Sequence, residues 1–266
     1  MKKFLKVSKF FIKMLPALIG AYFGWVLRYS INPEKHPFEV RYAKFRKLML
    51  KVAKTTQLNL KTENLDLLNN VEPGSLIIGN HQSAMDIVII GALSERPLSF
   101  VAKKETKKLP IVGKCIKILG GVFLDRNDAI QAVKCFKIAQ DNMEKGISYV
   151  IYPEGTRNRM PLSTDVGPFH SGSFRLGLKA EKGILVFSSF GQFRVLSNEC
   201  MYKSYLTQFK FLEFLPASIF KEKSTNDIAE DCRTEINNSI NEMKLVDKEY
   251  IDNKSYKTKA PKWWKK

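Results

Sequence analysis

The sequence contains few acidic residues, few histidines and few cysteines, and each shortage excludes a class of protein. Only 26 Asp and Glu residues accompany 44 Lys and Arg, so the 266-residue chain has a net charge of +18. With three histidines, four cysteines and no C-x-x-C spacing, a structural zinc site or disulfide scaffold is not expected. We expect free thiols in a reducing cytoplasm at Cys115, Cys135, Cys200 and Cys232. The 44% of hydrophobic residues allows a packed core and excludes global disorder.

The excess positive charge lies at the two ends of the chain. Residues 1–54 contain thirteen Lys or Arg against two acids, and residues 254–266 contain six Lys and no acid. Residues 55–253 therefore carry a net charge of only +1. A nucleic-acid enzyme usually spreads positive charge over the domain face that does the work. Basic ends with apolar and aromatic residues are typical of proteins that bind anionic lipids, so we expect anionic membrane lipids as partners and no nucleic acid.

The N-terminal segment is apolar, but its charge-free run is short. Residues 10–27 read FFIKMLPALIGAYFGWVL, and no charge occurs from Met14 to Leu27. Fourteen helical residues span about 21 Å, less than the roughly 30 Å hydrocarbon core of a bilayer. A signal peptide is the alternative, but no small-x-small cleavage site follows. We expect a helix that dips into one leaflet or marginally spans the cell membrane, with the lysines before residue 10 on the cytoplasmic face.

Two further segments have amphipathic character. Helical spacing places one apolar stripe on a single face, formed by Phe38, Tyr42, Phe45, Met49 and Val52. The face roughly opposite carries Lys44, Lys47, Lys51 and Lys54. A helix packed on the protein's own core would show the same pattern, but beside the preceding apolar segment we expect a membrane-lying pair. Residues 254–266 place Trp263 and Trp264 among lysines, which suits lipid headgroups; a disordered tail is the alternative.

Between the basic ends, short apolar runs alternate with helical patterns. Strands are predicted at 75–79, 99–102, 122–124, 148–152, 184–190 and 208–214. Helices are predicted at 85–93, at 103–119 as one helix or a pair, from a cap at Asn127 or Asp128 up to Gly146, at 174–182 and at 224–243. The inward face of the helix after Asp128 is expected to carry Ala129, Ile130, Val133, Phe136 and Met143.

This alternation predicts an α/β fold, with a sheet of about six or seven strands flanked by helices and preceded by the N-terminal membrane-associated helical pair. We divide the chain into a membrane-binding segment at 1–58, an α/β domain at 59–253 and a basic Trp-containing tail at 254–266.

One His–Asp pair has the spacing of a catalytic base. Residues 78–88 read IGNHQSAMDIV, with His81 and Asp86 five residues apart. In one regular helix the two side chains would point some 140° apart, so they meet only if His81 lies in a loop and Asp86 in the first helical turn. Asp86 could then orient the imidazole while His81 takes a proton from a hydroxyl group. A structural hydrogen-bonding histidine is the alternative for an isolated pair.

Two further segments follow predicted strands and carry arginine. GVFLDRN ends at Asn127 and contains Arg126, and YPEGTRN ends at Asn158 and contains Glu154 and Arg157. Ligands of α/β sheets gather at the carboxyl ends of strands, and guanidinium groups match phosphate oxygens. Taken singly, Arg126 could form a surface ion pair and Glu154 a structural hydrogen bond. Together, the segments predict a phosphate-bearing substrate beside a general base.

These motifs resemble a known family. NHQSAMD, GVFLDR and YPEGTRN, in this order and at these separations, are similar to the first three blocks of the glycerolipid acyltransferases with an H-x4-D motif. In length and in its basic N-terminal segment, the chain most resembles bacterial 1-acylglycerol-3-phosphate acyltransferases. The resemblance covers about residues 74–215. It departs from the family at Tyr152, where Phe is frequent, at Asn158, where Ser is common, and at 184–190, which lacks the usual proline of the fourth block.

The resemblance implies a reaction and a set of residues. His81, supported by Asp86, would deprotonate the 2-hydroxyl of lysophosphatidate, and that oxygen would attack an acyl thioester to give phosphatidate. The glycerol phosphate would be bound by Arg126, Glu154, Gly155, Thr156 and Arg157, with Lys103 as a further candidate. The co-substrate would be acyl-CoA or acyl-ACP (acyl carrier protein), with no metal and no other cofactor.

Four alternatives stay open. The family also contains enzymes with other acceptors, such as glycerol 3-phosphate or another lysophospholipid. GNH begins a metal-binding block in calcineurin-like phosphatases, but the D-x-H element and further histidines of that class are missing. A non-catalytic membrane-surface protein would leave the two polar groupings unexplained. A nucleic-acid binder is opposed by the nearly neutral body and the lack of a basic–aromatic stripe.

Overall fold

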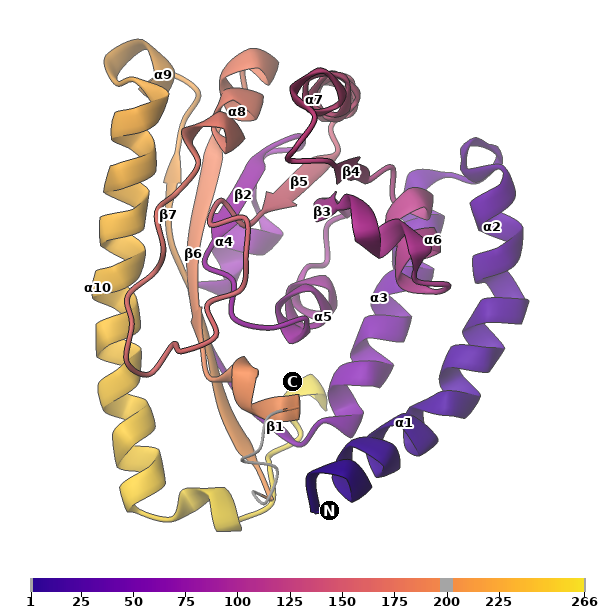
Figure 1. Cartoon of the computed structure of the whole chain (residues 1–266), viewed down its shortest axis with the longest axis vertical. Coiled ribbons are helices and arrows are strands. Elements are labelled where there is room, and N and C mark those ends of the chain that lie inside the picture. The colour runs from indigo at the N-terminus through magenta and orange to yellow at the C-terminus, as the bar shows by residue number, and fades with distance from the viewer. Residues whose placement is uncertain (1, 197–202, 266) are drawn as a thin grey trace.

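A seven-stranded mixed sheet forms the centre of the molecule (Figure 1). The computed structural model describes residues 2–196 and 203–265. The strand order is β1-β7-β6-β2-β5-β3-β4. The strands are β1 (Leu58–Glu63), β2 (Leu76–Gly79), β3 (Leu98–Lys103), β4 (Val122–Leu124), β5 (Ser148–Ile151), β6 (Ile184–Phe190) and β7 (Tyr205–Leu215). The predicted α/β fold with six or seven strands is therefore confirmed.

The direction of the strands brings the three sequence motifs to one edge. β2 is parallel to both β5 and β6, β3 is parallel to β5, and β4 is parallel to β3. Only the β6–β7 pairing is antiparallel among the described strands. The carboxyl ends of β2, β5, β3 and β4 consequently share one edge, and the segments that follow them lie next to one another. β6 reads ILVFSSF and is buried throughout, as expected for a central strand covered on both faces.

Helices cover the sheet on both faces and form two hydrophobic cores. One face carries α1 (Lys2–Ala21), α2 (Leu27–Ile31), α3 (Phe38–Thr55), α5 (Met85–Leu93) and α6 (Val112–Ile118). The other carries α7 (Ala129–Glu144), α8 (Arg175–Ala180) and α10 (Thr225–Asp252). Shorter helical segments are η1 (Tyr22–Val26), η2 (Pro33–Lys35), α4 (Leu65–Asn69), η3 (Lys104–Lys108), η4 (Ser171–Ser173), η5 (Gln192–Leu196), α9 (Ile219–Glu222), η6 (Ser255–Lys257) and η7 (Trp263–Lys265).

Capping residues fix where two of the helices begin. Asp128 accepts a hydrogen bond from the backbone N–H of Gln131, which starts α7 where the sequence predicts. Ser224 and Asp227 form a reciprocal capping box at the start of α10. The predicted end of α10 at residue 243 is too early, since the helix continues to Asp252. The elements β1 and α4 were not predicted. β1 alternates Leu58 and Leu60 with polar residues over only half its length, so its sequence signal is weak.

The inward face predicted for α7 is partly wrong. Ile130 and Val133 are 71% and 69% exposed, whereas Cys135, Ala139 and Met143 face the core. Helical geometry cannot place Ile130 and Ala139 on the same side, because nine residues turn the helix through about 900°. The face that carries Cys135, Ala139 and Met143 packs on the sheet, and Ile130 and Val133 remain outside.

The apolar stripe of the second N-terminal helix does not face lipid. Tyr42, Phe45 and Met49 of α3 are buried against the core, and α3 packs on α5. The hydroxyl of Tyr42 lies 3.4 Å from the carbonyl oxygen of Gly91. The expectation that α3 lies in the membrane through this stripe is therefore wrong, and the alternative of packing on the protein's own core holds. The reason is that α5 presents an almost continuous apolar surface that α3 covers.

The first N-terminal helix, by contrast, retains an exposed apolar stripe. Ile12, Leu15, Ile19 and Phe23 are between 48% and 71% exposed, and their spacing places them on one side of α1–η1. The opposite side packs on α3 through residues such as Met14, which is 1% exposed. By length and composition, Ile12–Ile31 is apolar enough to cross a membrane. A mostly buried core helix or a signal sequence satisfies the same criterion.

Three of the four cysteines are buried free thiols, as expected. They are Cys115, Cys135 and Cys232, while Cys200 lies outside the described residues. Burial raises the pKa of the Cys115 and Cys232 thiols to about 12. Both therefore stay protonated and unreactive near neutral pH.

Candidate active site

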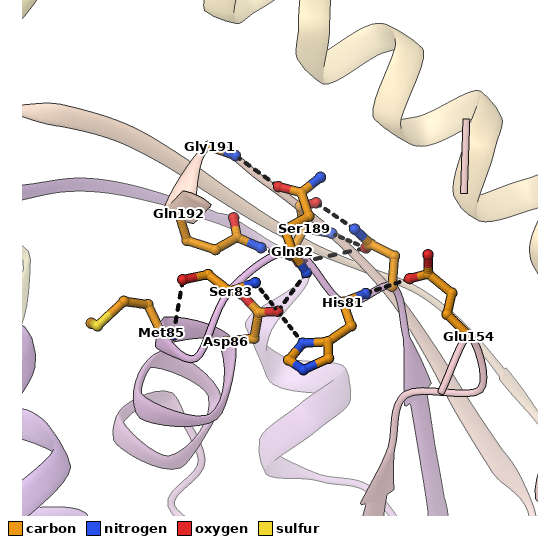
Figure 2. Close-up of polar contacts among 10 residues, drawn as sticks. His81, Gln82, Ser83, Met85, Asp86, Glu154, Ser189, Gly191 and Gln192 are labelled. Atoms are coloured by element: carbon orange, nitrogen blue, oxygen red, sulfur yellow. Dashed lines mark hydrogen bonds and ion pairs between the residues drawn. The ribbon is translucent and has the colours of Figure 1, made fainter. Parts of the chain in front are cut away.

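His81 and Asp86 form a direct polar contact at the carboxyl edge of the sheet (Figure 2). His81 lies in the loop after β2, and Asp86 is the second residue of α5. The imidazole Nδ1 is 2.6 Å from Asp86 Oδ2. The strand–loop–helix connection thus brings together two side chains that a continuous helix would separate. This is the arrangement that the sequence predicts.

The Asp86 carboxylate is buried and held by the loop itself. It is 0% exposed, and Oδ2 also accepts hydrogen bonds from the backbone N–H groups of Gln82 (2.8 Å) and Ser83 (3.0 Å). Three donors on one oxygen fix the carboxylate in position. Within the described residues Nε2 of His81 forms no hydrogen bond, and the side chain is 18% exposed. An Nδ1–H donated to Asp86 would leave the lone pair of Nε2 free to accept a proton.

The third motif holds the backbone of His81 from both sides. Glu154 Oε1 accepts a hydrogen bond from the His81 N–H at 2.6 Å, and the Asn158 N–H donates to the His81 carbonyl oxygen at 2.8 Å. The other carboxylate oxygen, Oε2, accepts from the Gly167 N–H at 3.2 Å. The ring of Tyr152 stacks on the imidazole at 4.4 Å between centroids. This motif therefore determines where the imidazole sits.

Burial changes the acid–base behaviour of two of these groups. Glu154 is 7% exposed, and desolvation raises the pKa of its carboxyl, although two backbone N–H groups oppose the shift. Burial, assisted by the negative charge of Asp86, raises the pKa of the Tyr152 hydroxyl well above its ordinary value. That hydroxyl has no hydrogen-bond partner in the described part of the chain. Tyr152 is thus a neutral platform for the imidazole near neutral pH.

Two amides beside His81 tie the loop to β6, and sequence analysis did not single them out. Asn80 Nδ2 donates to the Ser189 carbonyl oxygen at 2.9 Å, and Asn80 Oδ1 accepts from the Ser189 N–H at 2.8 Å. Gln82 Oε1 accepts from the Gly191 N–H at 3.3 Å. Figure 2 shows the Gln82 amide directed away from the imidazole toward Gly191, just after β6. Their position on either side of His81 in NHQ is the signal that could have revealed them.

Arg126 reaches from β4 to the loop after β5. A Cβ atom added to Gly155 would lie 3.0 Å from Arg126 Cζ, so the guanidinium packs directly over this glycine. Gly155 has φ +70°, a conformation that other residues adopt only with strain. Small size and positive φ together explain why glycine occupies this position. The guanidinium is brought beside the same loop that holds His81, as a phosphate ligand would need to be.

The other predicted phosphate ligands are placed more loosely. Thr156 and Arg157 are exposed on the loop after β5. Lys103, at the end of β3, is also exposed and forms a 3.5 Å ion pair with Glu105. The structure thus brings His81, Asp86, Glu154, Gly155 and Arg126 together. Roles in substrate binding stay predictions for all six residues: Lys103, Arg126, Glu154, Gly155, Thr156 and Arg157.

The geometry is that of a general base beside a cationic group. An imidazole with one nitrogen on a buried carboxylate and the other unpaired can accept a proton from a substrate hydroxyl. Among the described residues, no cluster of three or more His, Cys, Asp or Glu could hold a metal ion. The partial exposure of the His81 side chain, 18%, leaves the imidazole in reach of solvent.

Comparisons with known proteins agree with this geometry. The Acyltransferase family profile matches residues 54–189. A probable 1-acyl-sn-glycerol-3-phosphate acyltransferase of Mycoplasma genitalium is 26% identical over 81% of this chain and 83% of its own. An uncharacterized acyltransferase of Schizosaccharomyces pombe is 28% identical over 69% of this chain, and a chloroplastic 1-acyl-sn-glycerol-3-phosphate acyltransferase of Arabidopsis thaliana is 25% identical over 60%. The matches span 66% and 46% of those two relatives.

A solved structure extends the likeness to the fold. The 1-acyl-sn-glycerophosphate acyltransferase PlsC from Thermotoga maritima superposes with a TM-score of 0.69 over 92% of this chain and 98% of its own, at 22% identity. Because the family profile covers the whole region that carries the His–Asp pair and the arginine motifs, we conclude that the chain belongs to the Acyltransferase family.

Proposed function

We propose that this protein transfers an acyl group from a thioester to the 2-hydroxyl of 1-acylglycerol 3-phosphate, giving phosphatidate for phospholipid synthesis. The observation that carries the proposal is the 2.6 Å contact between His81 and the buried Asp86, with Nε2 unpaired and Arg126 near the same loop. The relatives in Mycoplasma genitalium and Arabidopsis thaliana bear the name of this activity. Their names support the acceptor, and the site supports the chemistry.

The proton transfers follow from the geometry of the pair. Nε2 of His81 removes the proton from the 2-hydroxyl as its oxygen attacks the thioester carbon. The Asp86 carboxylate stabilises the imidazolium that forms, because it lies against Nδ1. When the carbon–sulfur bond breaks, the imidazolium returns the proton to the leaving thiolate. The acceptor gains the acyl group, the donor leaves as a free thiol, and His81 is restored.

Cationic side chains would bind the phosphate of the acceptor. Arg126 is the best placed, because its guanidinium lies over Gly155 beside the His81 loop. Exposed Thr156 and Arg157 on the same loop, and Lys103 at the next strand end, can add donors when substrate binds. The donor would be acyl-CoA or acyl-ACP, which share a phosphopantetheine thioester. No cofactor is part of the proposal.

The substrate is a lipid, so the proposed place of work is the cytoplasmic face of the cell membrane. An exposed stripe on α1–η1 can enter one leaflet at the boundary between headgroups and acyl chains, while the opposite side of α1 stays packed on α3. The stripe consists of Ile12, Leu15, Ile19 and Phe23. The lysines that precede the stripe favour the cytoplasmic side. This proposal leaves the apolar membrane contact to α1–η1 and removes the buried apolar stripe of α3 from it.

An acyl-transfer assay tests the function. Purified protein in detergent micelles should convert lysophosphatidate and an acyl thioester to phosphatidate in the presence of a metal chelator. His81→Ala should remove activity, while His170→Ala, an exposed histidine of the same chain, should leave it unchanged. Retained turnover by His81→Ala would reject the mechanism. Comparison of glycerol 3-phosphate, lysophosphatidate and other lysophospholipids then establishes the acceptor, and comparison of acyl-CoA with acyl-ACP establishes the donor.

A further inference from the structure

The C-terminal tail is an ordered segment that crosses from one layer of the molecule to the other. After α10 the chain turns at Lys254, which has φ +53°. The carbonyl oxygen of Tyr256 accepts hydrogen bonds from the N–H groups of Lys203 (2.9 Å) and Ser204 (3.2 Å), just before β7. Trp263 is half-buried and packs against the hydrophobic core on the α3 side. The alternative of a disordered tail is therefore wrong, and residues 254–265 are tied to the body at two places.

The tail ends where the first and third helices meet. Lys54, near the end of α3, has its Nζ 5.6 Å from the ring centroid of Trp264. Trp264 in turn packs edge-to-face on Trp263 at 5.7 Å. The next residue of α3, Thr55, donates a hydrogen bond to the sulfur of Met14 in α1 at 3.1 Å. The first half of α1, the last turn of α3 and the tail thus gather at one end of the molecule, where Figure 1 also places the two termini.

The three segments that meet at this end are rich in lysine. The first half of α1 contributes Lys2, Lys3, Lys6, Lys9 and Lys13, the end of α3 contributes Lys51 and Lys54, and the tail contributes six lysines. No acidic residue occurs in residues 1–33, 40–62 or 253–266. Within the described residues, Lys13, Lys54 and the tail lysines up to 262 form no ion pair. Unpaired like charges held together repel one another unless an anionic surface compensates them.

We propose that the tail, the end of α3 and the start of α1 form one basic–aromatic surface that binds anionic phospholipid headgroups. Two observations favour a bilayer over a soluble anion. The exposed apolar stripe on α1 begins at Ile12, directly beside this surface, so apolar and basic contacts can be made at the same time. Adjacent Trp and Lys side chains are typical of the headgroup region of membranes. The inference rests on the proposed membrane function and adds a second contact, far from α1 in sequence.

The physical role of the second contact is orientation. A single amphipathic helix can bind a leaflet and still rotate about its own axis. A basic surface fixed to the body by Trp263 removes that freedom, because both contacts must meet the same plane. Trp263 therefore acts as the attachment of the tail to the protein, and the lysines act on the lipid.

Vesicle binding with matched charge changes tests the proposal. Lys254, Lys257, Lys259 and Lys262 are exposed tail residues and would be changed together to Gln. The control changes Lys134, Lys145, Lys179 and Lys221 to Gln, which removes the same charge from exposed positions on the opposite layer. Binding is measured by co-sedimentation with phosphatidylcholine vesicles, with and without phosphatidylglycerol.

We expect the tail variant to lose more than about tenfold in partitioning to phosphatidylglycerol vesicles, since each lysine near an anionic leaflet contributes about fivefold. The control variant should lose less than about twofold, and binding to phosphatidylcholine alone should not change. An equal loss in both variants would overturn the proposal. The tail variant should keep its acyl-transfer activity in detergent micelles. A failure of the membrane-binding proposal can therefore be told apart from a failure of the proposed enzymatic function.

A fluorescence measurement on the native tail gives an independent answer. The chain has three tryptophans, so Trp25→Phe leaves only Trp263 and Trp264 as emitters. Phosphatidylglycerol brominated near the headgroup end of its chains should quench this emission on vesicle binding. Unquenched emission from vesicle-bound protein would show that the tail stays away from the bilayer and would overturn the proposal.

Discussion

The role of Glu154 separates two explanations of the third motif. Family resemblance assigns Glu154 to the glycerol phosphate, but the structure shows both carboxylate oxygens engaged by backbone N–H groups of His81 and Gly167. Glu154 is only 7% exposed, so its carboxyl group is poorly placed to contact a phosphate. Desolvation also raises the pKa of this carboxyl group. An anion beside a phosphate would also repel it. We therefore predict that Glu154 acts on catalysis by positioning His81.

Glu154→Gln isolates this effect with little change in shape. The amide has one acceptor oxygen where the carboxylate has two, so one of the two N–H donors loses its partner and faces an N–H₂ group. Hydrogen bonds to charged groups contribute about 1.5–3 kcal/mol. If the His81 loop loses that stabilisation in the transition state, kcat should decrease about 10- to 100-fold. The KM for lysophosphatidate should change by less than about twofold, because no acceptor ligand is removed.

The assay is release of the thiol from acyl-CoA, followed at varied lysophosphatidate in detergent micelles. Glu154→Asp keeps the charge but is one methylene too short to reach both donors, so it should also lower kcat. Glu144→Gln, an exposed glutamate on α7, serves as the matched control. A raised KM with unchanged kcat would refute the reasoning and return Glu154 to the acceptor site. Circular dichroism shows whether each variant is folded.

Three further predictions concern the phosphate side of the site and the pH dependence of stability. Arg126→Ala should raise the KM for lysophosphatidate about tenfold or more with little change in the KM for the thioester, because a guanidinium–phosphate contact is lost; the opposite pattern would reverse the assignment. Gly155→Ala should lower stability by about 1 kcal/mol, since φ is +70°, and raise the same KM by displacing the guanidinium; thermal unfolding and kinetics measure both. The pKa of Glu235 is raised to about 7, mainly by burial. A hydrogen bond between Glu235 and Glu213 and the negative charge of Glu213 add to this shift. A raised carboxyl pKa means that stability is full below the unfolded pKa near 4.5 and is lost as pH rises through about 7. Glu235→Gln should therefore be more stable than wild type by about 1 kcal/mol at pH 8 but not at pH 4, with the magnitude reduced by partial exposure; equal unfolding temperatures at pH 8 would contradict this.

Local patterns in the chain predicted much of the fold. Continuous apolar runs such as ILVFSSF belong to central strands, and their short length between turn residues was enough to identify them. Ser224 with Asp227, and Asp128, started helices where capping chemistry predicts. The spacing of His81 and Asp86 predicted a loop–helix arrangement, because no regular element brings them together. These inferences succeeded because each depended on interactions between residues close in sequence.

Contacts between distant residues were decided only by the tertiary structure. The amphipathic pattern of α3 is the same for a lipid surface and for a protein core, and only the apolar surface of α5 determined which one it meets. Glu154 lies 73 residues from His81, so its hydrogen bond to the His81 backbone has no signal in local sequence. Trp264 of the tail meets Lys54 of α3, which lies 210 residues earlier in the chain. The sequence by itself determined which groups could react and where the charge lies; strand order and packing determined which of them touch, because those contacts depend on how the whole chain closes its core.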